Sequence, residues 1–119
     1  MNKNNKFDLD ERTAKFGEGI IQFAKTIPQS PITLPLITQL VKTGTSVGAN
    51  YSEADCAESK KDFEHKIGIC KKESKETKHW LRMISKAAPE CRDEVKELWK
   101  ETHEFNLIFS SIIIKSRQK

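Results

Sequence analysis

A row of basic side chains is the feature of this sequence whose residue types and spacing best suit a chemical task. No acidic residue interrupts their face of a helix over a rise of about 38 Å, and His65, Gly68 and His79 occupy the intervening positions. Such a row can follow the phosphates of a nucleic acid, so it predicts nucleic-acid binding. The fixed cations of this basic row are Lys61, Lys72, Lys75, Arg82 and Lys86.

A second interpretation of the basic row stays open beside the first. Runs of charge are most often solvated helix faces with ordinary pairs between residues four apart. No Phe, Tyr or Trp lies on the same face, so we expect recognition of shape and charge there rather than base stacking. Five phosphate contacts would give a log–log salt slope of about −3.5 to −4.5.

Metal-dependent and nucleophilic chemistry find little support in the residue pattern. His65 and His79 are about 21 Å apart along a helix, too far to share a metal ion. The sequence has a single Glu-x-x-His pair, Glu76 with His79, whereas the carboxylate di-iron bundle pattern needs one on each of two helices. Cys70 and Cys91 occupy core positions, and Cys56 has no histidine placed to activate it. We therefore expect a non-enzymatic protein with no catalytic residue, no metal site and no cofactor.

Asn50 and Glu53 form a polar pair beside a run of small residues. One interpretation makes them part of an active site. The favoured interpretation is a buried polar anchor that hydrogen-bonds to another helix and sets the register between the two.

We expect helices to position these side chains. Residues 42–54 are the segment whose composition favours a helix least, because it contains two glycines. Gly44 and Gly48 each cost a helix about 1 kcal/mol relative to alanine, so a loop is the alternative. Apolar and small residues nevertheless recur at alternating steps of four and three from Thr33 to Ala54. The pattern favours a helix whose glycines allow close packing against a neighbouring helix.

Helix boundaries are marked by capping residues and prolines. Asp8 or Asp10 can cap the first helix, and the segment from Pro28 to Pro31 ends it. Ser59 suits the start of the third helix, and Pro89 can begin the fourth.

The four-three alternation recurs in all four stretches, which predicts a single all-α domain over residues 1–119. Short connections make neighbouring helices antiparallel, and the seven-residue period favours left-handed packing. We therefore predict an antiparallel, up-down-up-down, left-handed four-helix bundle. Its helices span about 8–27, 32–57, 60–87 and 90–116.

The fourth helix carries more apolar residues than one bundle core requires. A helix that is apolar on every side is normally buried on every side, so a subunit interface is predicted there. The alternative is a wide core stripe with a few exposed apolar side chains. Leu107 lies off the main stripe together with the proposed interface residues, Ile108, Ile113 and Ile114.

Composition sets the protein class and the compartment. A net charge of +4 is mildly basic, which agrees with an anionic partner without requiring one. Three cysteines without a C-x-x-C pair favour a reducing cytoplasm. We find neither a signal-peptide pattern nor a stretch of ~18 uncharged apolar residues, so we expect no membrane association.

Three segments carry a family resemblance: GTSVGANYSEA (residues 44–54), Ser59 with Asp62 and Phe63, and KKESKETKHWLRMI (residues 71–84). From about residue 16 onward, the chain resembles the four-helix bundle proteins encoded by intervening sequences in bacterial large-subunit ribosomal RNA genes. The resemblance implies a left-handed antiparallel bundle, a ring-like homo-oligomer (a pentamer in relatives) and a role in binding nucleic acid. A related bundle, the accessory variability determinant of diversity-generating retroelements, partners a reverse transcriptase and RNA. The resemblance implies no catalytic residue.

Two functional hypotheses follow. In the first, the protein is a cytoplasmic bacterial homo-oligomer that binds structured RNA or another nucleic acid through the basic row. In the second, it is a scaffold or adaptor whose partner is a protein, such as a nucleic-acid enzyme. Steep salt dependence of RNA binding distinguishes the first from the second.

Overall fold

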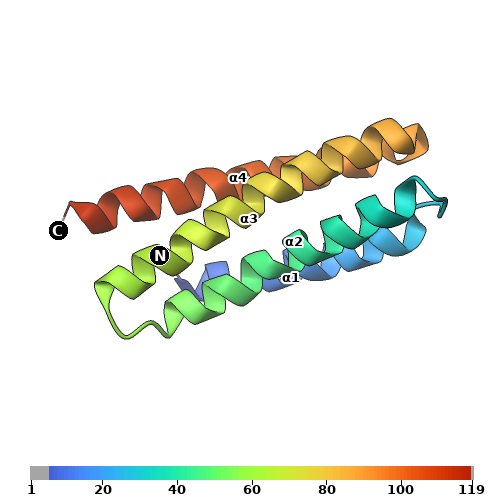
Figure 1. Ribbon diagram of the computed structural model, residues 1–119. Coiled ribbons are helices and arrows are strands. Elements are labelled where there is room, and N and C mark those ends of the chain that lie inside the picture. The colour runs from blue at the N-terminus through green and yellow to red at the C-terminus, as the bar shows by residue number, and fades with distance from the viewer. Residues whose placement is uncertain (1–5, 119) are drawn as a thin grey trace.

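The computed structural model describes residues 6–118, and four long α-helices account for most of them (Figure 1). No strand occurs in this described span, so the all-α prediction is confirmed. A short 3-10 helix, η1 (Pro89–Cys91), precedes the last α-helix. The four α-helices are α1 (Lys6–Thr26), α2 (Thr33–Asp55), α3 (Lys60–Ala87) and α4 (Arg92–Arg117).

Each helix packs beside the preceding one and runs back along it, as Figure 1 shows. The helices α1 and α4 approach each other much less closely. Within residues 6–118, no Cα pair lies within 8 Å between α1 and α3 or between α2 and α4. The bundle is elongated, with extents of 48 × 28 × 19 Å. Its left-handed sense stays a prediction.

The core follows the predicted four-three alternation, and every position of the stripe from Thr33 to Ala54 is buried or partly buried. Polar residues within it are hydrogen-bonded, as in the contact of 3.0 Å from the Thr77 hydroxyl to that of Thr43. No buried side-chain nitrogen or oxygen in the described part lacks a partner. Every helix contributes fully buried side chains, among them Ile20, Leu40, Ile67, Leu81, Ile84, Phe105 and Phe109.

Two helix ends differ from the sequence-based expectation. Helix α1 begins at Lys6, so Asp10 lies inside the helix and does not cap it, while the side chain of Asp8 is outside the described part. Pro89 starts a 3-10 turn before α4, which begins at Arg92. Ser59 does cap α3, since its hydroxyl accepts a hydrogen bond of 3.0 Å from the Asp62 backbone N–H.

The α1–α2 interface is built on glycines within continuous helix. A Cβ atom on Gly44 would lie 2.9 Å from Cγ1 of Ile20, and one on Gly48 would lie 3.2 Å from the carbonyl oxygen of Thr13. On α1, a Cβ atom on Gly17 would lie 3.6 Å from Cα of Thr45. At Gly48 and Gly17 the nearest atoms are backbone of the partner helix, whereas at Gly44 the Ile20 side chain fills the space that a Cβ atom would need. Residues 42–54 therefore form a helix whose glycines allow close packing against α1.

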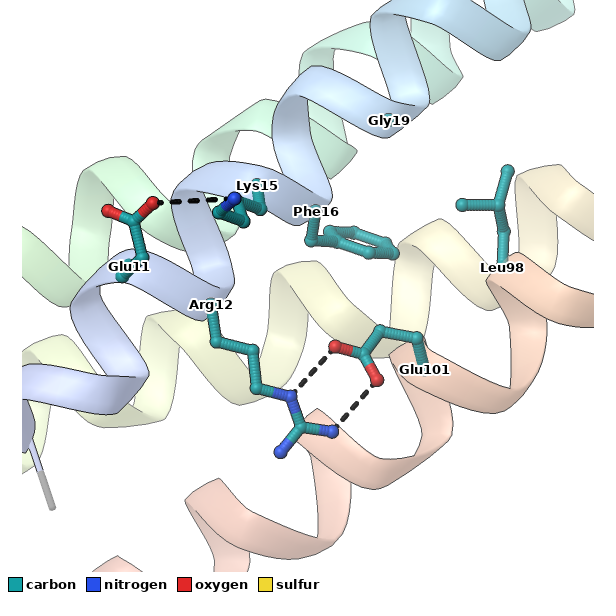
Figure 2. Close-up of a pocket in the computed structure, with 7 residues that line it drawn as sticks. All are labelled: Glu11, Arg12, Lys15, Phe16, Gly19, Leu98 and Glu101. Atoms are coloured by element: carbon teal, nitrogen blue, oxygen red, sulfur yellow. Dashed lines mark hydrogen bonds and ion pairs between the residues drawn. The ribbon is translucent and has the colours of Figure 1, made fainter. Parts of the chain in front are cut away.

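The α1–α4 interface is more open and carries an ion pair at one end (Figure 2). Arg12 donates two hydrogen bonds of 2.8 Å to the carboxylate of Glu101, and it also contacts Glu104. In the same interface, the rings of Phe16 and Phe105 meet edge to face at 5.3 Å between centroids. A groove beside these contacts is lined by Glu11, Arg12, Lys15, Phe16, Gly19, Leu98 and Glu101.

Candidate nucleic-acid interface

Helix α3 presents the whole basic row to solvent. All five cations are exposed, and so are His65 and His79 between them. The opposite side of the same helix carries Ile67, Leu81 and Ile84, which are fully buried. Because burial of that stripe fixes the rotation of α3, the basic row faces outward from the bundle.

The positive charge of the basic row is not neutralised within the bundle. None of its five cations forms an ion pair of 4.0 Å or less with any side chain from residue 9 to residue 118. Lys66, which lies beside the row, is instead 2.7 Å from Glu53 of α2. This hydrogen bond is the main cause that raises the pKa of Lys66. The positive electrostatic potential of the basic row therefore remains available to attract an external anion.

Glu73, an acidic residue that flanks the basic row, is half-buried. Burial is the largest cause that raises the pKa of Glu73, and repulsion from Glu76 adds to it. Attraction to Lys72 and to Lys42 of α2 opposes these effects.

The prediction of a buried polar anchor at Asn50 and Glu53 is wrong about burial. Glu53 is exposed, although it does link α2 to α3 through Lys66. Asn50 is half-buried and donates a hydrogen bond of 2.9 Å to the Ser46 carbonyl of its own helix. The pair sits one step outside the buried stripe of Val47, Tyr51 and Ala54, where long polar side chains reach solvent.

Gly68 interrupts the basic row with bare backbone. No atom outside the helix's own local backbone lies within 4 Å of the position that its Cβ atom would occupy. Close packing therefore does not explain this glycine, in contrast to Gly44 and Gly48. It leaves a stretch of α3 between Lys61 and Lys72 that a partner can approach closely.

Sequence reasoning missed a cluster at the α4 edge of the row, formed by Lys78, Trp99 and His103. The Lys78 ammonium lies 3.1 Å from Nδ1 of His103 and 4.9 Å from the centroid of the Trp99 ring. The two rings stack at 5.2 Å between centroids with an interplanar angle of 14°. The four-residue spacing of Trp99 and His103 on α4 was the available signal, but their meeting with Lys78 depends on how α3 and α4 align.

The apolar surplus of α4 divides into two groups. Ile108 and Ile113 are partly buried and pack against the core, so for these two the structure favours the wide core stripe. Leu107 and Ile114 are 57% and 58% exposed, one heptad apart on the same side of the helix. An apolar surface on α4 therefore involves Leu107, which the predicted interface set left out, together with Ile114.

The remaining nucleophilic candidates lie apart from the basic row. Cys70 is fully buried, and burial raises the pKa of its thiol to about 12. Cys91 is buried as well, whereas Cys56 is exposed. No group of three or more His, Cys, Asp or Glu side chains suited to a metal ion occurs among the side chains described, residues 9–118. None of the described helices is long and apolar enough to cross a membrane.

Comparisons with known proteins agree with this architecture. The family described as 23S rRNA-intervening sequence protein matches residues 5–111. A crystal structure of a protein with unknown function from the S23 ribosomal protein family of Bacteroides thetaiotaomicron is similar, with a TM-score of 0.80 and 29% sequence identity. That likeness covers 87% of this chain and 96% of the other. No curated protein matches the chain. Four helices and a family match over most of the length lead to one conclusion: the chain belongs to the 23S rRNA-intervening sequence protein family.

Proposed function

We propose that this protein binds structured RNA, without catalysis, through the basic row of α3. The single observation that carries the proposal is the exposure of all five cations with no ion pair to any described residue. Together they offer phosphate contacts along about 38 Å of helix. A family defined by a ribosomal RNA insertion supports RNA as the partner, and the cysteine pattern supports the reducing cytoplasm as its place.

The proposal is tested by titrating a structured RNA hairpin at several salt concentrations. Full engagement of the row gives a log–log slope of about −3.5 to −4.5. Reversing two charges with Lys72→Glu and Lys75→Glu removes two contacts, so the slope becomes shallower by about 1.4–1.8 and the affinity falls.

A matched control makes the same charge change on α1, which lies diagonally across the bundle from α3. Lys15→Glu and Lys25→Glu alter net charge equally but leave the basic row intact. Equal loss of affinity in both double variants would mean that net charge, and not the row, governs binding. Absence of RNA binding by the unaltered protein at low salt would favour the adaptor with a protein partner instead.

We also propose that the bundle self-associates through α4. Leu107 and Ile114 support this, because two large apolar side chains one heptad apart stay exposed on one side of the helix. Family resemblance supports a ring, with a pentamer as its expected size. Since the predicted interface residues Ile108 and Ile113 pack against the core, Leu107 and Ile114 are the better contacts for a second copy.

Sedimentation tests the self-association. Ile114→Glu should lower the oligomer mass without lowering helicity, because this side chain makes no large contribution to the core. Ile113→Glu should disturb the fold as well, since its side chain packs against buried residues. A native protein that sediments as a monomer at micromolar concentration would contradict the proposal.

A further inference from the structure

We propose that Trp99 forms a stacking site for one unpaired nucleobase, at the α4 edge of the basic row and backed by His103. This inference rests on the proposed RNA-binding function and adds a kind of recognition that the row alone does not offer. It names a ligand class, an unpaired nucleotide, that a fully paired duplex does not present. Trp99 is 38% exposed, so part of its indole is accessible to a ligand.

The observed contacts of the indole with Lys78 and His103 lie on one of its two faces. A lysine ammonium only donates, so Nδ1 of His103 accepts its hydrogen bond, which lies near the plane of the imidazole. That plane is nearly parallel to the indole, at 14°. The ammonium and the imidazole therefore sit on the same side of Trp99. No other ring or cation among the described residues lies against the indole, which is 38% exposed, and we assign this exposed surface to the opposite face, where a base can stack.

Positive charge surrounds this site. On α3, three other cations lie within two helical turns of Lys78: Lys71, Lys75 and Arg82. On α4, Lys96 and Lys100 are exposed next to Trp99. When a base stacks on the indole, the phosphates of its own nucleotide and of the adjacent nucleotides therefore lie near cations of both helices.

A nucleotide matches this combination because it joins a flat aromatic base to an anionic phosphate. Stacking on tryptophan is tolerant of sequence, since every base has a π-face. The Lys78–His103 hydrogen bond and the ring stack hold the indole in place before binding. The Trp99 side chain therefore loses less conformational entropy when a base binds. The site is therefore expected to select unpaired over paired RNA, without a preference among bases.

Two single-tryptophan variants report on the site directly, because the chain has two tryptophans. In Trp80→Phe, the only indole is Trp99; in Trp99→Phe, the only indole is Trp80, which packs partly buried against the core. The probe is a single-stranded oligouridylate of about 12 nucleotides, with a blunt RNA duplex of equal length as comparison. We expect the oligouridylate to quench fluorescence of the first variant but not of the second, and the duplex to quench neither.

Affinity gives an independent readout. Trp99→Ala should weaken binding of the oligouridylate about 5- to 100-fold while leaving duplex affinity and the salt slope unchanged, because the ring contacts no phosphate. Trp99→Phe keeps an aromatic face, so its loss should be smaller. Thermal unfolding followed by circular dichroism verifies that each variant is folded at the assay temperature.

The outcomes separate this inference from the proposed function. RNA binding with a normal salt slope but no Trp99 quenching, or with equal affinity in Trp99→Ala, overturns the stacking site and leaves the basic row standing. Equal quenching by duplex and single strand also overturns it. Failure of the unaltered protein to bind either RNA at low salt overturns both proposals.

Discussion

Helix α1 is attached to the bundle by two interfaces of different construction. Against α2, glycines let the two backbones nearly touch, and a Cβ atom on Gly44 would lie 2.9 Å from Cγ1 of Ile20. Against α4, Phe16 reaches Phe105, Arg12 pairs with Glu101, and a groove remains beside them. The first interface depends on Gly44 and Gly48, where an added Cβ atom would force its neighbours to shift. The second depends on a few large side chains and tolerates changes at its rim.

The largest expected effect comes from removing the aromatic contact of the α1–α4 interface. Phe105 is fully buried and touches Phe16, Phe109 and the Arg12 guanidinium. Phe105→Ala should lower the free energy of unfolding by about 3–5 kcal/mol, through lost transfer energy and the cavity left behind. Chemical denaturation measures this loss. Glu97→Ala, an exposed site on the same helix, serves as the control and should change stability by less than about 0.5 kcal/mol.

A methyl group placed in the α1–α2 interface should have the next largest effect. Gly44→Ala improves helix propensity by about 1 kcal/mol, but its Cβ atom would overlap the β-branched side chain of Ile20. Overpacking costs of about 1–3 kcal/mol then outweigh the gain, and we expect net destabilisation of about 1 kcal/mol. A stabilised Gly44→Ala protein in urea denaturation would show that the two backbones can separate at little cost.

A glycine-to-alanine substitution on the outward face of α3 should instead raise the free energy of unfolding. Nothing lies within 4 Å of the Cβ position of Gly68 except its own helix. Gly68→Ala should therefore stabilise the bundle by about 0.5–1 kcal/mol through helix propensity alone. Thermal unfolding of Gly44→Ala and Gly68→Ala side by side measures the difference that packing makes. RNA binding by Gly68→Ala then reports whether a partner uses the bare backbone.

The smallest effect is expected at the rim of the α1–α4 groove. Hydrogen bonding to Glu101 raises the pKa of Arg12 above its usual value, so the guanidinium stays charged wherever the bundle is folded. The pair is partly solvent-exposed, which limits its contribution to about 0.5 kcal/mol. Arg12→Met should lose that amount at low salt and less at high salt. A salt-independent loss would assign the effect to packing over Phe105 instead.

Much of the fold could be predicted because the heptad pattern is nearly unbroken. Stripes such as Leu40, Val47 and Ala54 specify which side of each helix is buried, and their period specifies helix over sheet. Boundary errors arose where competing signals overlapped, as at Pro89, which starts a 3-10 turn instead of α4. The basic row was found because it is a one-helix pattern, and burial of the opposite side orients it.

Features that join two helices were harder to predict. The proposed anchor at Glu53 proved exposed because the exact rotation of α2 decides which of two adjacent positions is buried. Ile108 and Ile113 pack against the core because α4 contributes a wider stripe than the heptad alone indicates. The meeting of Lys78 with Trp99 and His103 has no local signal, since it requires the axial alignment of α3 with α4.

By itself, the order of residues determined four amphipathic helices, their antiparallel succession and the cationic side of α3, because each of these depends on spacing along one helix or on a short connection. Tertiary structure alone decided how close α1 comes to α2, how far it stays from α4, and which α4 side chains lie beside the basic row. These properties depend on distances between side chains far apart in the chain, and such distances are settled only when all four helices pack together.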